Sequence, residues 1–239
     1  MKWSRRALTA TAATFAIAAL GWTGVAGAQA PAPLKIGIIG TGKIGSALAR
    51  HWVAAGHEVF VSSRHPEELK SLVAELGPRA HVGTPKEAAA FGSVVLVSIP
   101  YGAMPQIGID NAAELKGKII IDTSNPVAGR DGAMASDAQK KGAGVATAEL
   151  LKNPRVVRAF NCIGFASLAS DSNKKPTRIA IPIGGDDAEA LKVTERLVND
   201  AGFDVVVVGS LAKSREFDLG QPLANSSLTA AAYRAQFKL

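Results

Sequence analysis

The chain has 239 residues, of which 47% are hydrophobic, 20% charged and 5% aromatic. This composition excludes a disordered chain and fits one well-filled α/β core with a small appendage. The formal net charge of +7 favours anionic ligands, but no Lys/Arg run with interleaved aromatic residues occurs, so we expect no nucleic-acid partner. The single cysteine, Cys162, excludes an intrachain disulfide and a paired-cysteine metal or redox motif.

The N-terminal residues have the three-part layout of a secretory signal peptide. Residues 1–6 are short and basic, residues 7–25 are apolar, and Ala26-Gly27-Ala28 offers small residues for cleavage. We expect residues 1–28 to be removed and residues 29–33 to form a spacer. The mature protein is then periplasmic or secreted, with no stable membrane span. Arg5-Arg6 resembles a twin-arginine signal, and the Sec route and an uncleaved anchor are the alternatives.

A glycine-rich loop follows the first predicted strand, residues 34–39. It reads Gly40-Thr41-Gly42-Lys43-Ile44-Gly45, and residues 46–55 continue with helical spacing. The first glycine allows a tight turn, the second lets the backbone approach a pyrophosphate, and the third lets the helix pack on the sheet. The helix N-terminus favours the phosphates. The order of strand, loop and helix predicts a dinucleotide site formed by these six residues.

The end of the second predicted strand, residues 58–61, distinguishes between the two nicotinamide dinucleotides. An NAD site places Asp or Glu near this point to bind the ribose 2′-hydroxyl, whereas this chain has Ser62, Ser63 and Arg64. Hydroxyl groups and a guanidinium bind a 2′-phosphate that a carboxylate would repel. We therefore expect NADP(H). The alternative is a serine-rich turn that caps the following helix.

The remaining predicted strands alternate with helices. The strands cover residues 94–99, 118–121, 156–159, 178–183 and 204–208, with a marginal one near 80–82. Helices are predicted up to residue 76 and over 86–91, 134–141 and 187–201, the last with Asp186 as its N-cap and Gly202 as its stop. This alternation predicts a doubly wound, Rossmann-type α/β fold with a parallel sheet and a small C-terminal α/β extension.

Several segments, in this order, resemble the family of NADPH-dependent coenzyme F420 reductases (F420-dependent NADP oxidoreductases). That family is similar to the cytosolic reductase domain of six-transmembrane ferric reductases. The segments are residues 35–64, Ser98-Ile99-Pro100, residues 122–126, residues 158–161 and residues 183–187. The resemblance implies one NADP-binding reductase domain over residues 34–211. Residues 212–239 fall outside it and are a candidate cover for the acceptor pocket.

The resemblance also implies roles for residues that follow three strands. Ser98-Ile99-Pro100 would contact the nicotinamide or its ribose, Asn125-Pro126 would shape the neighbouring turn, and Asn161 would line the acceptor pocket. The alternatives are an ordinary Asn-Pro turn and a loop asparagine. Reductases of this type pass hydride directly between the nicotinamide and an acceptor, so we expect no catalytic side chain and no metal ligand.

These observations predict an exported NADPH-dependent oxidoreductase. Its small-molecule electron acceptor is a flavin-like ring, a deazaflavin such as coenzyme F420, a quinone or a chelated metal. The alternative is an exported NADP-binding sensor or accessory subunit without turnover. A β-hydroxyacid dehydrogenase or pyrroline-5-carboxylate reductase is disfavoured, because those enzymes need a helical second domain and the residues after Asn125 still alternate between strand and helix. A homodimer is one option for the oligomeric state.

Overall fold

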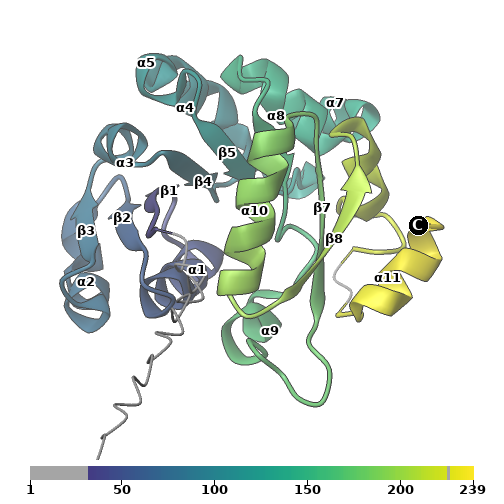
Figure 1. The fold of residues 1–239 in the computed structure, drawn as a ribbon. Coiled ribbons are helices and arrows are strands. Elements are labelled where there is room, and N and C mark those ends of the chain that lie inside the picture. Colours follow the sequence, from purple (N-terminus) through teal and green to yellow (C-terminus); the bar gives the residue numbers. More distant parts are fainter. Residues whose placement is uncertain (1–31, 225–226) are drawn as a thin grey trace, which may run out of the picture. The chain divides into compact units, whose positions relative to one another are not determined.

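An eight-stranded sheet with helices on both of its faces forms the centre of the fold (Figure 1). The computed structural model describes residues 32–224 and 227–239. The predicted signal peptide and most of the 29–33 spacer lie outside these residues. Pro33–Leu239 form one compact unit. Within the part of the chain that the structure describes, no helix is long and apolar enough to cross a membrane.

The first six strands of the sheet run parallel. They are β1 (Lys35–Ile39), β2 (Glu58–Ser62), β3 (Ala80–Gly83), β4 (Val94–Val97), β5 (Ile119–Asp122) and β6 (Val156–Arg158). They lie in the order β3-β2-β1-β4-β5-β6. Strands β4 and β5 are buried along their whole length, as strands covered on both faces should be. The order is that of a doubly wound dinucleotide-binding sheet, so the predicted fold class is confirmed.

The seventh strand departs from the prediction of a parallel sheet. Strand β7 (Ala180–Gly185) is antiparallel to β6, and β8 (Asp204–Gly209) is parallel to β7. The helix between β6 and β7 is α9 (Phe165–Ser170), which has only six residues and packs against α1 (Lys43–Ala54). A parallel strand requires a crossover that returns the chain to the opposite edge of the sheet, and α9 does not supply one.

Helices cover both faces of the sheet and bury alternate residues of its strands. One face carries α1, α2 (Lys70–Leu76) and α10 (Ala188–Asp200). The other face carries α3 (Pro85–Phe91), α4 (Met104–Asp110), α5 (Ala112–Leu115), α7 (Ala133–Lys141) and α8 (Ala143–Leu151). Short helical turns connect these elements: η1 (Pro66–Leu69), η2 (Tyr101–Ala103) and α6 (Ala128–Asp131).

The N-cap of α10 lies one residue later than predicted. The side chain of Asp187 accepts a hydrogen bond from the backbone N–H of Ala190 at 2.7 Å. Asp186 instead accepts a hydrogen bond from the backbone N–H of Leu211 at 2.9 Å. The shift follows from the length of β7, which continues to Gly185 and leaves Asp186 in the turn.

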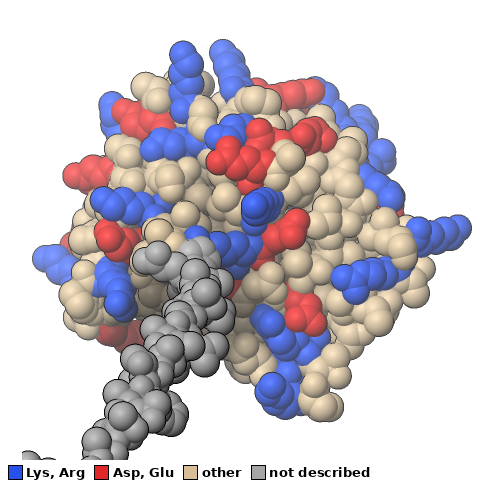
Figure 2. Space-filling model, viewed as in Figure 1, with Lys and Arg blue, Asp and Glu red and all other residues tan. Residues whose placement is uncertain are grey.

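The C-terminal residues pack on β7 and β8 through η3 (Ala212–Phe217) and α11 (Ala230–Phe237) (Figure 1). Among the described residues of 212–239 there is no strand, so the extension predicted as α/β is helical there. Its aromatic side chains Phe217, Tyr233 and Phe237 form a small core with Cys162 and the inner residues of β8. On the face shown in Figure 2, basic and acidic side chains are interspersed and neither sign covers it.

Candidate functional site

Two adjoining cavities lie at the carboxyl ends of the parallel strands. The first has a volume of about 530 Å³ and lies over the ends of β1 and β2. The second has a volume of about 420 Å³ and lies over the ends of β4, β5 and β6. Both are lined by Gly42 and by Ser98-Ile99-Pro100. A cleft along the carboxyl edge of a doubly wound sheet is where a dinucleotide binds in this architecture.

The three glycines of the loop have different surroundings. A Cβ atom on Gly40, whose φ is +92°, would lie 2.3 Å from the carbonyl oxygen of Ser98. A Cβ atom on Gly45 would lie 2.4 Å from the carbonyl oxygen of Gly40. A Cβ atom on Gly42 would meet nothing within 4 Å. Gly40 and Gly45 are therefore needed for packing, whereas the space beside Gly42 belongs to the cleft and admits a close ligand.

Helix α1 begins directly at this loop with its first N–H groups uncapped. Its N-cap residue, Gly42, has no side chain to accept them, and no acidic residue occurs in the first turn. Lys43 and Ile44 line the second cavity. The open backbone at Gly42 and the uncapped helix end fit the pyrophosphate of a dinucleotide.

The residues after β2 divide into one buried serine and two that line the cleft. The Ser62 hydroxyl donates to the carbonyl oxygen of Ile38 at 2.7 Å and is fully buried, so the prediction that it contacts a 2′-phosphate does not fit its position. Ser63 and Arg64 line the first cavity. The Arg64 side chain is exposed and makes no hydrogen bond or ion pair with any described residue. Thr41 also lines this cavity, and its Oγ1 accepts from the N–H of Ser62 at 3.0 Å.

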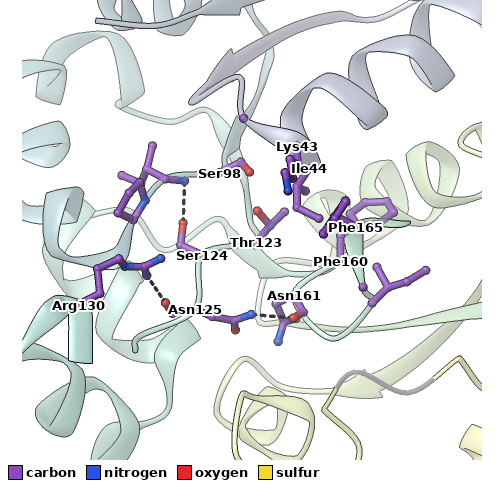
Figure 3. A pocket seen from close by; sticks show the side chains of 15 residues that line it. Lys43, Ile44, Ser98, Thr123, Ser124, Asn125, Arg130, Phe160, Asn161 and Phe165 are labelled. Carbon is purple, nitrogen blue, oxygen red and sulfur yellow. Dashed lines mark hydrogen bonds between the residues drawn. The ribbon is translucent and has the colours of Figure 1, made fainter. Parts of the chain in front are cut away.

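The ends of β4 and β5 form the wall between and beyond the two cavities. The backbone N–H of Ile99 donates to the hydroxyl of Ser124 at 3.3 Å, which joins the two strand ends (Figure 3). Thr123 and Ser124 line the second cavity with Asn125. Pro126 does not reach the cavity wall, and its carbonyl oxygen accepts from Gln139 at 3.1 Å. Pro126 therefore belongs to the turn, as the sequence implies.

Two asparagine side chains lie together at the far end of the second cavity (Figure 3). Nδ2 of Asn125 donates to the carbonyl oxygen of Asn161 at 2.8 Å. Nδ2 of Asn161 donates to the carbonyl oxygen of Phe217 at 3.0 Å. The preceding Phe160 has a positive φ of 59°, an uncommon conformation for a bulky residue that is typical of functional sites. The chain turns sharply there and brings Asn161 to the cavity.

A buried arginine supports these side chains from behind. Nη2 of Arg158 donates to Oδ1 of Asn125 at 2.8 Å, and Arg158 is fully buried. Its Nη1 donates to Asp122 at 2.9 Å and its Nε donates to Asp218 at 3.0 Å. Burial disfavours the charge of Arg158, but the two carboxylates outweigh that effect and raise the pKa of Arg158. Burial also raises the pKa of Asp122, against the opposing effect of Arg158.

Three side chains at the edges of the second cavity carry charge or an exposed ring. Nη2 of Arg130 donates to the carbonyl oxygen of Asn125 at 2.7 Å (Figure 3). Hydrogen bonds from Arg130 lower the pKa of Asp131 to about 2. Nζ of Lys43 lies 4.2 Å from the ring centroid of Phe165, whose side chain is 48% exposed. This cation–π contact joins α1 and α9 at the edge of the cavity.

Several lining residues do not belong to the predicted set. Arg130, Ile163, Gly164 and Phe165 lie in short helices or loops whose sequences carry no motif, and they reach the cavity only through the tertiary fold. Phe160 lies within the 158–161 segment but is apolar, which is typical of a core residue. Asp218 supports the site from residues 212–239. Among the described residues of 212–239, none lines the cavity, and Phe217 and Asp218 support its lining residues from behind, the latter through Arg158.

The comparisons with known proteins agree with this geometry. A family described as NADP oxidoreductase, coenzyme F420-dependent, matches residues 35–126, from β1 to the Asn-Pro turn. The F420-dependent NADP reductase of Methanocaldococcus jannaschii is 32% identical over 213 residues, which cover 80% of this chain and 90% of that protein. Metalloreductase STEAP3 of Rattus norvegicus is 31% identical over 191 residues, 77% of this chain but 36% of that protein. A hypothetical protein from Sinorhizobium meliloti, known from a crystal structure, is 27% identical in sequence. Its structure matches this one with a TM-score of 0.68 over 83% of this chain and 96% of that chain.

Proposed function

This chain belongs to the F420-dependent NADP oxidoreductase family, and from that premise we propose that it is an NADPH-dependent reductase that passes hydride to a small electron acceptor. The observation that carries the proposal is the pair of adjoining cavities along the carboxyl edge of the sheet. The first has the space and the free cation that an adenosine 2′-phosphate requires, and the second extends over β4 to β6.

The residues of the first cavity fit NADP(H) better than NAD(H). Arg64 has no partner among the described residues and reaches the cavity together with Ser63. Within the part of the chain that the structure describes, no carboxylate lines this cavity. A guanidinium beside a hydroxyl binds a phosphate through charge-assisted hydrogen bonds, which supports NADP(H) as the dinucleotide.

The proposed mechanism assigns binding and orientation to this chain. The loop from Gly40 to Gly45 and the first turn of α1 hold the pyrophosphate. Ile99 and Pro100 line both cavities and would form an apolar wall that excludes water from the nicotinamide. When bound, the nicotinamide supplies the hydride. The side chains beyond it, from Thr123 to Asn161, position the acceptor, and we propose no proton-transferring residue.

We propose a flavin-like or deazaflavin ring as the acceptor, in preference to a quinone or a chelated metal. Phe165 is half-exposed at the cavity edge, and Nζ of Lys43 lies over one face of its ring. A planar ring stacks on such a residue, and an anionic substituent on the acceptor is attracted by the lysine. The relative named for coenzyme F420 is matched over 90% of its length, whereas the metalloreductase is matched over 36%.

We also propose that the protein is exported, on the basis of residues 1–28. The test is the mass of the mature protein isolated from the producing cell. A first residue of Gln29 supports export, whereas a retained Met1 in a cytoplasmic fraction contradicts it.

The activity is tested by incubating the folded protein with NADPH and a panel of acceptors: flavins, coenzyme F420, quinones and ferric chelates. We expect faster oxidation of NADPH than of NADH with a flavin or F420. Tight NADPH binding without oxidation by any acceptor contradicts the reductase proposal and favours an NADP-binding protein without turnover. Preferential turnover of ferric chelates contradicts the proposed acceptor but leaves the proposed reductase activity intact.

A further inference from the structure

Asn161 carries a buried polar atom that no group of the described residues satisfies. Its Oδ1 has no hydrogen-bond partner among the described residues, and the residue is only 5% exposed. Asn161 also lines the 420 Å³ cavity. Buried acceptors in folded proteins are almost always paired, because an unmade hydrogen bond away from water is costly. An unpaired acceptor on a residue that lines a cavity therefore points to a donor on a ligand.

The orientation of this amide is fixed by its neighbours. Its Nδ2 donates to the carbonyl oxygen of Phe217 at 3.0 Å, so rotation by 180° would set Oδ1 against another acceptor. The backbone oxygen of Asn161 accepts from Asn125, which Arg158 holds in turn. Phe160 anchors the chain just before it, with its ring 6.3 Å from that of Trp52. The free acceptor is thus held in place before any ligand arrives.

The place of Asn161 in the fold limits which donor it meets. It follows β6, and Ser98-Ile99-Pro100 follows β4, with β5 between them. Two strand spacings correspond to about 10 Å. A nicotinamide ring together with an acceptor ring stacked on it would fit within this distance. We propose that Oδ1 of Asn161 accepts a hydrogen bond from an amide-type N–H of the ligand in this cavity. This inference rests on the proposed function.

Two ligand groups share that chemistry, namely the carboxamide of the nicotinamide and the ring imide of a flavin-type acceptor. A quinone without N–H groups does not supply the donor. The test compares two matched pairs of probes by their dissociation constants. One pair is NADP⁺ and its 3-acetylpyridine analogue, in which a methyl ketone replaces the carboxamide. The other is riboflavin and 3-methylriboflavin, in which a methyl group replaces the imide hydrogen.

We expect wild-type protein to bind the N–H-bearing member of one pair about 10-fold more tightly, and Asn161→Ala to reduce that preference to about 2-fold. The pair that responds identifies the donor. Asn161→Asp keeps an oxygen on the same stem and is expected to retain the preference, although its overall affinity falls beside the Phe217 carbonyl. Asn199→Ala, at an exposed position of α10, is the matched control and leaves both preferences unchanged.

An unchanged preference in Asn161→Ala overturns the proposal, and so does a wild-type protein that distinguishes neither pair. Because the readout is a ratio of affinities within one variant, a partly destabilised variant still gives a valid result. Wild-type protein that binds NADP⁺ without any preference overturns only this inference. Wild-type protein that does not bind NADP⁺ overturns the proposed function as well.

Discussion

The carboxylate of Asp218 accepts a hydrogen bond from Nε of Arg158 at 3.0 Å, across 60 residues of chain, and thereby joins the C-terminal residues to the candidate site. Both side chains are buried. The other carboxylate oxygen of Asp218 accepts from the N–H of Ala143 at 2.8 Å, at the start of α8. One aspartate therefore connects η3, β6 and α8 behind the acceptor end of the cleft.

Replacing this aspartate is expected to destabilise the protein. Asp218→Ala leaves Arg158 buried with one carboxylate partner fewer, and we expect the free energy of unfolding to fall by about 3–5 kcal/mol. Urea denaturation measures the change. Asp137→Ala, which removes an exposed partner of Lys140, is the control and is expected to cost less than about 1 kcal/mol. Equal losses in the two variants contradict a structural role for the buried pair.

The loop glycines offer a test that separates folding from binding. Gly45→Ala places a Cβ atom against the Gly40 carbonyl and is expected to lower both stability and NADPH affinity. A Cβ atom in Gly42→Ala meets no atom of the described residues within 4 Å, so this variant is expected to fold normally and to lose NADPH binding through contact with the pyrophosphate. Thermal unfolding and NADPH titration give the two readouts. Gly129→Ala, also with an unobstructed Cβ position, controls for the substitution itself. Normal NADPH binding by Gly42→Ala is the contrary result.

Arg64 is expected to set the preference for NADPH. Arg64→Gln removes the cation but keeps a polar side chain of similar length. We expect the dissociation constant for NADPH to rise about 10- to 100-fold and that for NADH to stay nearly constant, because a charge-assisted hydrogen bond contributes about 1.5–3 kcal/mol. Arg79→Gln alters an exposed arginine that does not line the cavity and serves as the control. A parallel loss of NADPH and NADH affinity contradicts the assignment.

Cys162 is expected to be chemically inert in the folded protein. Burial raises the pKa of its thiol to about 12, so almost no thiolate exists near neutral pH. Iodoacetamide is expected to leave native protein unmodified and to alkylate Cys162 rapidly in urea, as followed by mass spectrometry. Rapid alkylation under native conditions shows instead that the small core around Phe217 and Tyr233 opens readily.

Asp131 gives the stability a defined dependence on acid pH. Hydrogen bonds from Arg130 lower its pKa from 3.8 to about 2, so the folded state favours the carboxylate. Its contribution is fully present above the unfolded pKa and is lost as the pH falls through the folded pKa. We therefore expect the difference in unfolding free energy between wild type and Asp131→Asn to shrink as the pH falls from 4 to 2. A difference that does not change over this range contradicts the assignment.

The sequence predicts the half of the site that depends on local pattern. The glycine loop, Ser63-Arg64 and Ser98-Ile99-Pro100 lie on the cleft because each directly follows a strand whose apolar run is plain in the sequence. Ser62 departs from the prediction because β2 includes it, and its hydroxyl then pairs within the sheet. A strand that is one residue longer than predicted therefore turns a predicted ligand-binding hydroxyl into a buried one.

The other half depends on contacts between distant parts of the chain. Arg158 stands in an otherwise apolar strand, and its carboxylate partners lie 36 residues before it and 60 residues after it, so no local period links them. Helix α8 is absent from the predicted elements because Gly142 and Gly144 interrupt its start and its alanines give no clear face. The direction of β7 follows from a connection whose single helix is too short to cross the sheet. The length of that helix is difficult to predict from the sequence, because its residues are mostly small.

The reversal of β7 keeps the connection between β6 and β7 at the ligand-binding edge instead of sending it across the sheet. One wall of the second cavity is therefore a single surface segment, bounded by Asn161 and Phe165, that shares no residue with the glycine loop or with Ser63-Arg64. The connection that follows also packs into the core of the sheet through Leu168 and Ile179, so its anchoring residues are fixed by the fold. Under the proposed function, Ser63 and Arg64 would select the dinucleotide, whereas the segment bounded by Asn161 and Phe165, together with Lys43 of the glycine loop, would contact the acceptor.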